Sequence, residues 1–323
     1  MNGFLLRAWR GLEEIPGMGA ANGRLRAHVG VLDPIDIGAM THRYTHLVNS
    51  DPAVDCRIAV WDGATIGYAR VEWHDLVDGD RLYDVTTVVE PAAWGLGVAD
   101  GLLHWGEARI REIATTQVTD RRSWYQNETF GGDTELEDAL RRRGYAIVRW
   151  GAEMLRPHLE DIADVPLAAG YELRSPTEAE VPAVFEMLVA GFHDHWGEHD
   201  AGDARLDEWA EDPRFRRDLV VVAWRGSEPG SCVTGQLVDA PDGTVRALVA
   251  AVATHPAHRR RGLATAAITE CLRRLRAAGA TSAYLGVDQE NHNRAVDLYE
   301  ACGFSIASSD TTWRRPLNAE ETA

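Results

Sequence analysis

The chain repeats one order of segments twice, about 160 residues apart. In each copy a strand-like apolar run ends at a proline, a glycine-containing turn opens a long helical pattern, and a second helical pattern ends at Gly followed by an aromatic residue. These points are Pro91 and Gly144-Tyr145 in the first copy, and Pro256 and Gly303-Phe304 in the second. A repeat of this length is a domain, and 323 residues exceed one compact core. We therefore predict two tandem domains.

The second copy gives the clearest pattern. Residues 247–254 are a β-type apolar run, and the spacing of Ile268, Cys271 and Leu272 predicts a helix that ends at Gly279. A strand over 282–287, a helix that ends at Gly303 and a final strand from Phe304 follow. Residues 156–170 are rich in proline, glycine and acid. We place the domains at 1–157 and 171–323, joined by a linker at 158–170.

Composition excludes several classes of function. The formal net charge is −17, so phosphates are repelled and we expect no nucleic acid partner. No stretch approaches the ~20 apolar residues of a membrane span, and no signal core follows the N-terminus, so we expect a cytoplasmic protein that needs no membrane. The cysteines form no C-x-x-C pair, so we expect neither disulfides nor a metal. They are Cys56, Cys232, Cys271 and Cys302.

A basic cluster interrupts this acidic background. Arg259, Arg260 and Arg261 precede Gly262 and a predicted helix start, with the spacing R-x-x-G-x-A. A helix N-terminus presents unpaired amides and partial positive charge, and a glycine there lets an anion approach the backbone. We therefore predict a pyrophosphate site. The segment has no Walker lysine and lacks the first glycine of G-x-G-x-x-G. The structural alternative is an ordinary helix cap beside a solvated arginine cluster.

This segment, followed by VDQENHNRAVDLYEACGF at 287–304, resembles the GNAT superfamily of acetyl-CoA-dependent acyltransferases over residues 170–316. The resemblance implies an α/β (α+β) fold, in which each domain is a mixed, mostly antiparallel twisted sheet flanked by helices. It also implies acetyl-CoA as cosubstrate, with the strand lining the pantetheine arm and the loop holding the phosphates. The cofactor-binding residues are then Val252, Ala253, Thr254, Arg259, Arg260, Arg261, Gly262, Leu263, Ala264, Thr265 and Asn291. The two-domain layout further resembles the tandem acetyltransferases that include mycothiol synthase.

The tyrosine of the LYE segment is Tyr299. The resemblance implies that its hydroxyl donates a proton to the departing CoA thiolate. A buried phenol keeps its proton near neutral pH, which suits that role. The alternative is that Tyr299 only packs, because it shares a helix face with Leu298 and Cys302.

The acceptor pocket is expected at residues 192–200, FHDHWGEHD. Asp194 and Glu198 would attract an ammonium group, His195 would relay its proton and Trp196 would form an aromatic wall. The alternative is an acidic, solvated loop. The strand at 247–254 contains no acid that could act as a general base, so we expect deprotonation through water. His255 is expected to cap the turn.

The predicted function is N-acetylation of a primary amine on a small molecule. A protein N-terminus or lysine as acceptor, and a CoA-binding protein that sequesters its ligand without turnover, are the alternatives. The identity of the amine and the oligomeric state stay open. The first domain is expected to be inactive. Its loop at 90–103 keeps Gly95 and Gly97, but Trp94 stands where arginines are expected, and its tail lacks an equivalent of Tyr299.

Overall fold

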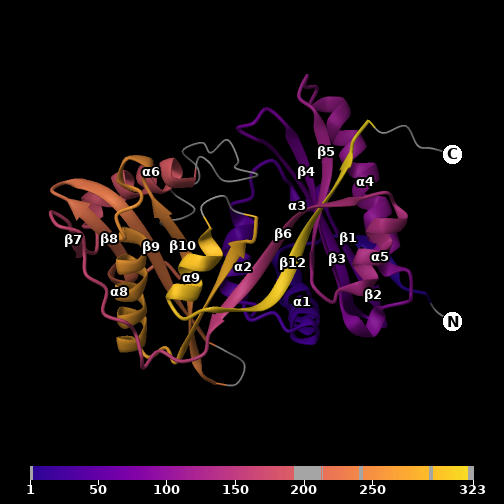
Figure 1. Ribbon diagram of the computed structural model, residues 1–323. Helices are drawn as coiled ribbons and strands as arrows, with labels where there is room; N and C mark the ends of the chain where they lie inside the picture. The colour runs from indigo at the N-terminus through magenta and orange to yellow at the C-terminus, as the bar shows by residue number, and fades with distance from the viewer. Residues whose placement is uncertain (1–2, 193–211, 213, 240–242, 291–293, 319–323) are drawn as a thin grey trace. The chain divides into compact units, whose positions relative to one another are not determined.

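The computed structural model describes residues 3–192, 212, 214–239, 243–290 and 294–318. The chain divides into two compact units (Figure 1). Unit 1 is Met1–Gly151 together with Ser308–Ala323, and unit 2 is Ala152–Ala307. Within the described ranges, no helix is long and apolar enough to cross a membrane.

Unit 1 is a mixed sheet with helices on both faces. Its strand order is β1-β2-β3-β4-β5-β12, and only the β4–β5 pair is parallel. Helices α4 and α5 cover one face, while α1 and α2 pack on the other. The elements are β1 (Leu5–Ala8), α1 (Ile15–Val29), α2 (Ile37–Thr45), α3 (Pro52–Asp55), β2 (Cys56–Trp61), β3 (Ala64–Asp75), β4 (Arg81–Val89), α4 (Val98–Thr116), β5 (Ser123–Phe130), α5 (Thr134–Arg142) and β12 (Ser305–Pro316).

Unit 2 repeats this plan. Its strands follow the order β11-β10-β9-β8-β7, with a parallel β10–β11 pair and antiparallel neighbours elsewhere. Strand β6 (Ala146–Arg156) runs from unit 1 into unit 2, where its second half lies beside β11. The other elements are β7 (Glu172–Arg174), α6 (Val181–Phe192), β8 (Val220–Arg225), β9 (Glu228–Asp239), β10 (Val245–Thr254), α8 (Leu263–Ala277), β11 (Ser282–Asp288) and α9 (Ala295–Ala301).

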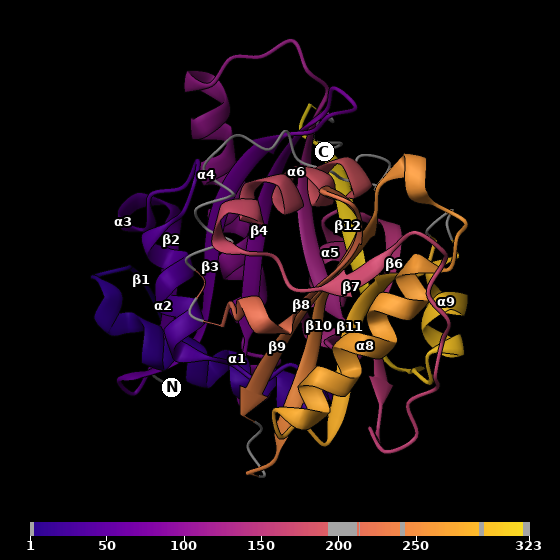
Figure 2. The same ribbon diagram turned by 90° about the vertical axis from the view of Figure 1, so that its left-hand side faces the viewer.

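The helices of unit 2 take opposite faces of its sheet. Helix α8 buries Cys271, Leu272 and Leu275 against the face that carries Val233 and Ala247. Helix α6 packs on the other face of the same strands. Figure 2 shows α8 lying across β9, β10 and β11. The strands and helices predicted for the second copy are confirmed, since each overlaps an observed element.

The last strand differs from the predicted division of the chain. Residues 308–316 of β12 belong to unit 1, where Asp310 to Pro316 pair with Phe130 to Trp124 of β5. Trp313 is 2% exposed in the core of unit 1, and its indole N–H donates to Thr129 and Thr311. The sequence repeat locates strands and helices, but the partner of a strand is set by long-range pairing and side-chain burial.

The join between the units differs from the predicted linker for the same reason. The predicted bounds place Ala152 and Met154 in the first domain and Leu159 in the linker, whereas all three are buried in the core of unit 2. The boundaries 1–157, 158–170 and 171–323 would therefore cut through both cores.

Candidate active site

The site in unit 2 starts at the loop between β10 and α8. His255 caps the turn by accepting a hydrogen bond from Ala257 N at 3.3 Å, as the sequence predicts. Two residues then adopt left-handed backbone, Arg260 at φ 64° and Gly262 at φ 74°. Helix α8 begins at Leu263 without a side chain that caps it. The amides of its first turn therefore keep their hydrogen-bonding capacity for another acceptor.

The space in front of this helix start is open. A Cβ atom built on Gly262 would meet no heavy atom within 4 Å. The partial positive charge of a helix N-terminus acts on this space, which suits an anionic group. The loop thus has the geometry of an anion site, and the exposed side chains of Arg260 and Arg261 add positive charge at its rim.

Strands β10 and β11 separate beside the loop. Their parallel pairing runs from Arg246–Ser282 to Leu248–Tyr284, and both strands then continue for several residues. The register of β10 against β9 shifts between Val249 and Ala251, so Ala250 lies in a β-bulge and is exposed in mid-strand. A bulge bends its strand and turns the following side chains to new directions. The two features open the sheet where a chain-like ligand can enter.

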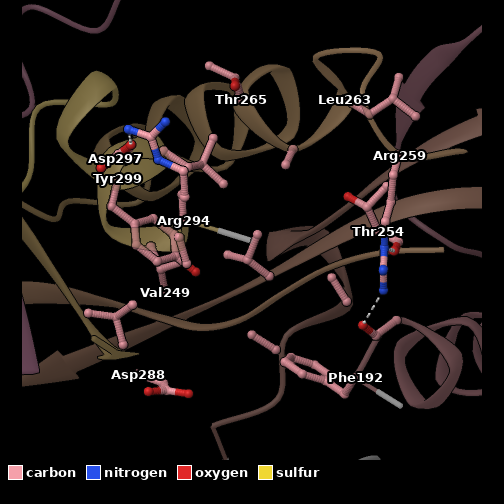
Figure 3. A pocket seen from close by; sticks show the side chains of 18 of the residues that line it. Phe192, Val249, Thr254, Arg259, Leu263, Thr265, Asp288, Arg294, Asp297 and Tyr299 are labelled. Carbon is pink, nitrogen blue, oxygen red and sulfur yellow. Dashed lines mark hydrogen bonds and ion pairs between the residues drawn. The ribbon is translucent and has the colours of Figure 1, made fainter. Parts of the chain in front are cut away.

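A cavity of about 700 Å³ occupies this opening. It extends from the first turn of α8 to α9 and reaches the C-terminal end of α6 (Figure 3). Its lining residues are Gly191, Phe192, Val249, Ala250, Ala251, Val252, Ala253, Thr254, His258, Arg259, Arg260, Gly262, Leu263, Ala264, Thr265, Gly286, Val287, Asp288, Arg294, Ala295, Asp297, Leu298 and Tyr299.

Tyr299 extends from α9 into this cavity (Figure 3). It is 8% exposed, and its ring packs edge-on against Phe304 with 6.2 Å between centroids. Burial raises the pKa of Tyr299 to about 12, and the nearby Cys302 thiol adds a smaller effect in the same direction. The phenol therefore keeps its proton across the physiological range and can donate it to a base that forms in the cavity.

Comparison with known proteins identifies the domain. Residues 181–304 match the acetyltransferase (GNAT) family. Unit 2 thus carries a GNAT acetyltransferase domain. Such domains take an acetyl group from acetyl-CoA, so the chain is an acetyl-CoA-dependent N-acetyltransferase.

Relatives of known name and fold extend the likeness to most of the chain. A mycothiol acetyltransferase of Geodermatophilus obscurus is 28% identical over 79% of this chain and 80% of its own length. A mycothiol acetyltransferase of Streptomyces avermitilis is 25% identical over 77% of this chain and 76% of its own length.

Solved structures give the same result for the fold. A GCN5-related N-acetyltransferase of Sphaerobacter thermophilus has a TM-score of 0.77 at 18% identity, over 98% of this chain and 96% of that one. A tandem GNAT protein from the clavulanic acid biosynthesis pathway has a TM-score of 0.68 at 16% identity, over 98% of this chain and 99% of that one. The chain has the tandem GNAT fold that its sequence predicts.

Most residues predicted to bind the cofactor line the GNAT cavity. These are Val252, Ala253, Thr254, Arg259, Arg260, Gly262, Leu263, Ala264 and Thr265. Arg261 is exposed beside the loop and is not among the lining residues. Asn291 and the predicted acceptor residues Asp194, His195, Trp196 and Glu198 lie outside the described residues.

Arg259 has a different environment from the one predicted. Its guanidinium donates to the carbonyl oxygens of Thr254 at 3.3 Å and Gly191 at 3.2 Å. Figure 3 shows the second of these bonds, which links the loop to the C-terminal end of α6. Helix α6 can approach β10 closely at Gly191, because a Cβ atom at this position would lie 2.8 Å from the Cβ of Ala253. Arg259 thus fixes the loop against α6.

Sequence reasoning missed three charged residues in the cavity. Asp288 ends β11, and Arg294 and Asp297 form an ion pair at the start of α9. The i, i+3 spacing of Arg294 and Asp297 was a visible signal for the pair. Asp288 lines the cavity because β11 has separated from β10 before this residue, and no local sequence pattern reveals where the two strands separate.

The matching loop of unit 1 makes hydrogen bonds to other groups of unit 1 itself. The amide of Gly95, two residues before the N-cap of α4, donates to a carboxylate oxygen of Glu135 at 3.1 Å. The indole N–H of Trp94 donates to Val89 O at 3.2 Å. Between β4 and β5, the Asn127 side chain bonds to Val85 O and to the Thr87 hydroxyl. The unit 1 loop therefore has a carboxylate partner, whereas the unit 2 loop exposes the arginines Arg260 and Arg261.

Proposed function

We propose that unit 2 transfers the acetyl group of acetyl-CoA directly to a primary amine of a small molecule, with Tyr299 as general acid. The observation that carries the proposal is the continuous cavity. It joins the uncapped start of α8 to the phenol of Tyr299 through the opening between β10 and β11. An anionic cofactor held at the helix start would extend its thioester along β10 toward that phenol.

The proposed reaction needs two proton transfers and one substitution. The neutral amine attacks the thioester carbonyl carbon, the C–N bond forms and the C–S bond breaks. The departing thiolate takes the proton of the Tyr299 hydroxyl, and the amine nitrogen loses one proton to water. The Tyr299 phenolate regains a proton from water before the next turnover. A phenol whose pKa is raised by burial to about 12 is protonated before each turnover, which supports this role.

Binding of the cofactor is assigned to named groups. We infer that the amides at the start of α8 hold the pyrophosphate and that Arg260 and Arg261 add charge at its rim. Val252, Ala253 and Thr254 line the path of the pantetheine arm. Unit 1 is proposed to be a degenerate GNAT domain, because its loop carries a carboxylate contact from Glu135 in place of arginines and its Asn127 side chain bonds between β5 and β4.

The acceptor is proposed to be a small molecule because two relatives are named for mycothiol, a low-molecular-weight thiol. Release of free thiol from acetyl-CoA, measured across a panel of small amines and peptides, tests the proposal. Turnover with small amines is expected. Turnover with peptides alone would favour a protein acceptor, and binding of acetyl-CoA without thiol release would favour a sequestering protein.

A further inference from the structure

The three arginines of the loop between β10 and α8 have different surroundings. Arg260 and Arg261 are exposed, so their charge is available to an anion at the start of α8. Arg259 is half-buried, and its guanidinium donates to the carbonyl oxygens of Thr254 at 3.3 Å and Gly191 at 3.2 Å. Figure 3 shows the Arg259 side chain extending from the loop toward the end of α6. Arg259 therefore binds the backbone of the protein itself, whereas its two neighbours are exposed to solvent.

The two carbonyls that Arg259 binds belong to different elements, and both elements line the cavity. Thr254 is the last residue of β10, and Gly191 lies in the last turn of α6. A carbonyl in the last turn of a helix can accept donors from outside the helix, and the partial negative charge there attracts a cation. A guanidinium presents its donors in a rigid planar fork, which can hold two acceptors in one geometry. Arg259 thus sets the position of the end of α6 relative to the end of β10.

Helix α6 and strand β10 are in direct contact at this point. A Cβ atom on Gly191 would lie 2.8 Å from the Cβ of Ala253 and 3.4 Å from Thr254 N. This contact prevents the end of α6 from moving toward β10, and the hydrogen bonds of Arg259 oppose movement away from it. The preceding turns of α6 bury three apolar residues in the core that contains Ala253, namely Val184, Met187 and Leu188. The separation of α6 and β10 at the cavity is therefore fixed from both sides.

This separation affects a reaction between two bound molecules. In the proposed function, the amides of α8 and the residues of β10 hold acetyl-CoA. Helix α6 supplies none of these groups, although its Gly191 and Phe192 line the same cavity. Displacing one reactant by about 1 Å relative to the other can lower a rate about a hundredfold. Resting on the proposed function, we infer that Arg259 is a positioning residue for acetyl transfer. It holds the end of α6 at the distance from β10 that the reaction needs, and it does not bind the phosphates.

Arg259→Lys separates this role from phosphate binding in the full-length chain. Lysine keeps the positive charge that a phosphate needs but lacks the fork that holds two carbonyls. Thiol release with the most active small amine of the panel should give a kcat that is lower by roughly tenfold or more. Calorimetry should give a Kd for acetyl-CoA close to that of the wild type. A phosphate ligand would behave in the opposite way, because Arg259→Lys would keep kcat and Arg259→Ala would raise the Kd.

Arg276 provides a matched control within unit 2. Its guanidinium also donates to two carbonyl oxygens, those of Leu159 at 3.1 Å and Glu160 at 3.0 Å, but Arg276 is not among the residues that line the cavity. Arg276→Lys should therefore leave kcat and the Kd for acetyl-CoA unchanged. Hydrogen exchange gives a readout that needs no substrate. The amides in the last turn of α6 should lose protection in Arg259→Lys but not in Arg276→Lys.

A second variant tests the separation of the two elements itself. Gly191→Ala places a methyl group against the Cβ of Ala253 and should push the end of α6 away from β10, so kcat should fall. Combining Gly191→Ala with Ala253→Gly removes the methyl group that it meets and should recover much of the loss. A double variant no faster than Gly191→Ala alone would contradict a role for this distance.

The outcomes distinguish this inference from the proposed function. A wild-type kcat in Arg259→Lys, or a loss of acetyl-CoA affinity as large as the loss of kcat, overturns the inference and leaves acetyl transfer standing. If Arg259→Lys does not fold, Gly191→Ala and the double variant decide the point. Acetyl-CoA binding by the wild type without thiol release for any amine overturns the proposed function, and the inference falls with it.

Discussion

At the scale of single residues, Gly262 controls access to the helix start. Its backbone is left-handed, and the space around its Cα is open. Gly262→Trp should weaken acetyl-CoA binding by roughly tenfold or more, because the indole would fill the space that the anion needs. Calorimetric titration measures the affinity.

The other end of α8 provides a control for Gly262→Trp. Gly279 also has positive φ, at 104°, with open space around it, and it lies outside the cavity. Gly279→Trp should bring comparable backbone strain and leave acetyl-CoA affinity near that of the wild type. Unchanged affinity in Gly262→Trp would remove the anion site from the proposal.

The phenol of Tyr299 can be tested apart from its packing. Tyr299→Phe keeps the ring against Phe304 and removes the proton donor. Turnover should fall by about ten- to a thousandfold while acetyl-CoA affinity stays near normal, as expected for a group that acts in the transition state. Steady-state kinetics and calorimetry together decide the point. If turnover persists and only the melting temperature falls, Tyr299 is a packing residue.

Much of the loop could be predicted residue by residue, because a helix start after Gly262 fixes the direction of its amides whatever the rest of the fold does. The environment of Arg259 could not be predicted from the sequence. Its guanidinium binds one carbonyl at the end of β10 and another at the end of α6, which are far apart in the chain.

At the scale of elements, the two loop–helix segments make a matched pair. Gly97 precedes α4 as Gly262 precedes α8, with φ of 79° and 74° and no heavy atom within 4 Å of a Cβ on either. Because Glu135 already binds the loop amide in unit 1, Gly97→Trp should leave turnover unchanged, and calorimetry should give one acetyl-CoA per chain. Two tight sites, or activity lost in a folded Gly97→Trp variant, would contradict the assignment of unit 1.

The largely buried carboxyl group of Asp84, in the sheet of unit 1, makes the free energy of unfolding of unit 1 depend on pH. Burial raises the pKa of Asp84 from 3.8 to about 7, and the charge of Glu72 adds to this, although Gln126 donates a hydrogen bond to it at 2.7 Å. Between pH 4 and 7 the folded state keeps a proton that the unfolded chain releases. The contribution of Asp84 to the free energy of unfolding therefore falls as pH rises through this window.

Asp84→Asn removes that contribution. The variant should gain stability relative to the wild type as pH rises from 5 to 8, measured by urea unfolding at each pH. A constant difference between the two proteins across this range would show that the Asp84 carboxyl titrates alike in the folded and unfolded states.

The order of elements in unit 2 could be read from the sequence because α8 and α9 each carry an apolar period and are each followed by a glycine, Gly279 and Gly303. The separation of β10 from β11 could not, because both strands read as continuous apolar runs. It accompanies the bulge at Ala250, which depends on the pairing of β10 with β9 and is therefore a long-range effect.

At the scale of the whole molecule, the final strand stabilises the first unit. Trp313→Ala should destabilise unit 1 by about 3–5 kcal/mol, since it leaves a large cavity beside Tyr125 and Tyr83. Hydrogen exchange during denaturant unfolding can assign the loss to unit 1. Ile306→Ala, on the same strand but 50% exposed, should have little effect. A loss of protection confined to unit 2 after Trp313→Ala would contradict the division of the chain.

The duplicated pattern correctly predicted two similar units but misplaced their limits. A repeat compares segments in the order of the chain, whereas a core is defined by which side chains meet. Trp313 is buried in the same core as Tyr125, and Met154 is buried in the core beneath α8, so each unit holds a segment that the linear order gives to the other.

The path of β12 also has a consequence during protein synthesis. Residues 152–307, which make up unit 2, leave the ribosome before the strand that completes unit 1. The half of the protein that is made first must wait with an unpaired edge at β5 until residues 310–316 emerge. Translation thus finishes unit 2 before unit 1, and unit 1 folds fully only after residues 310–316 have been translated.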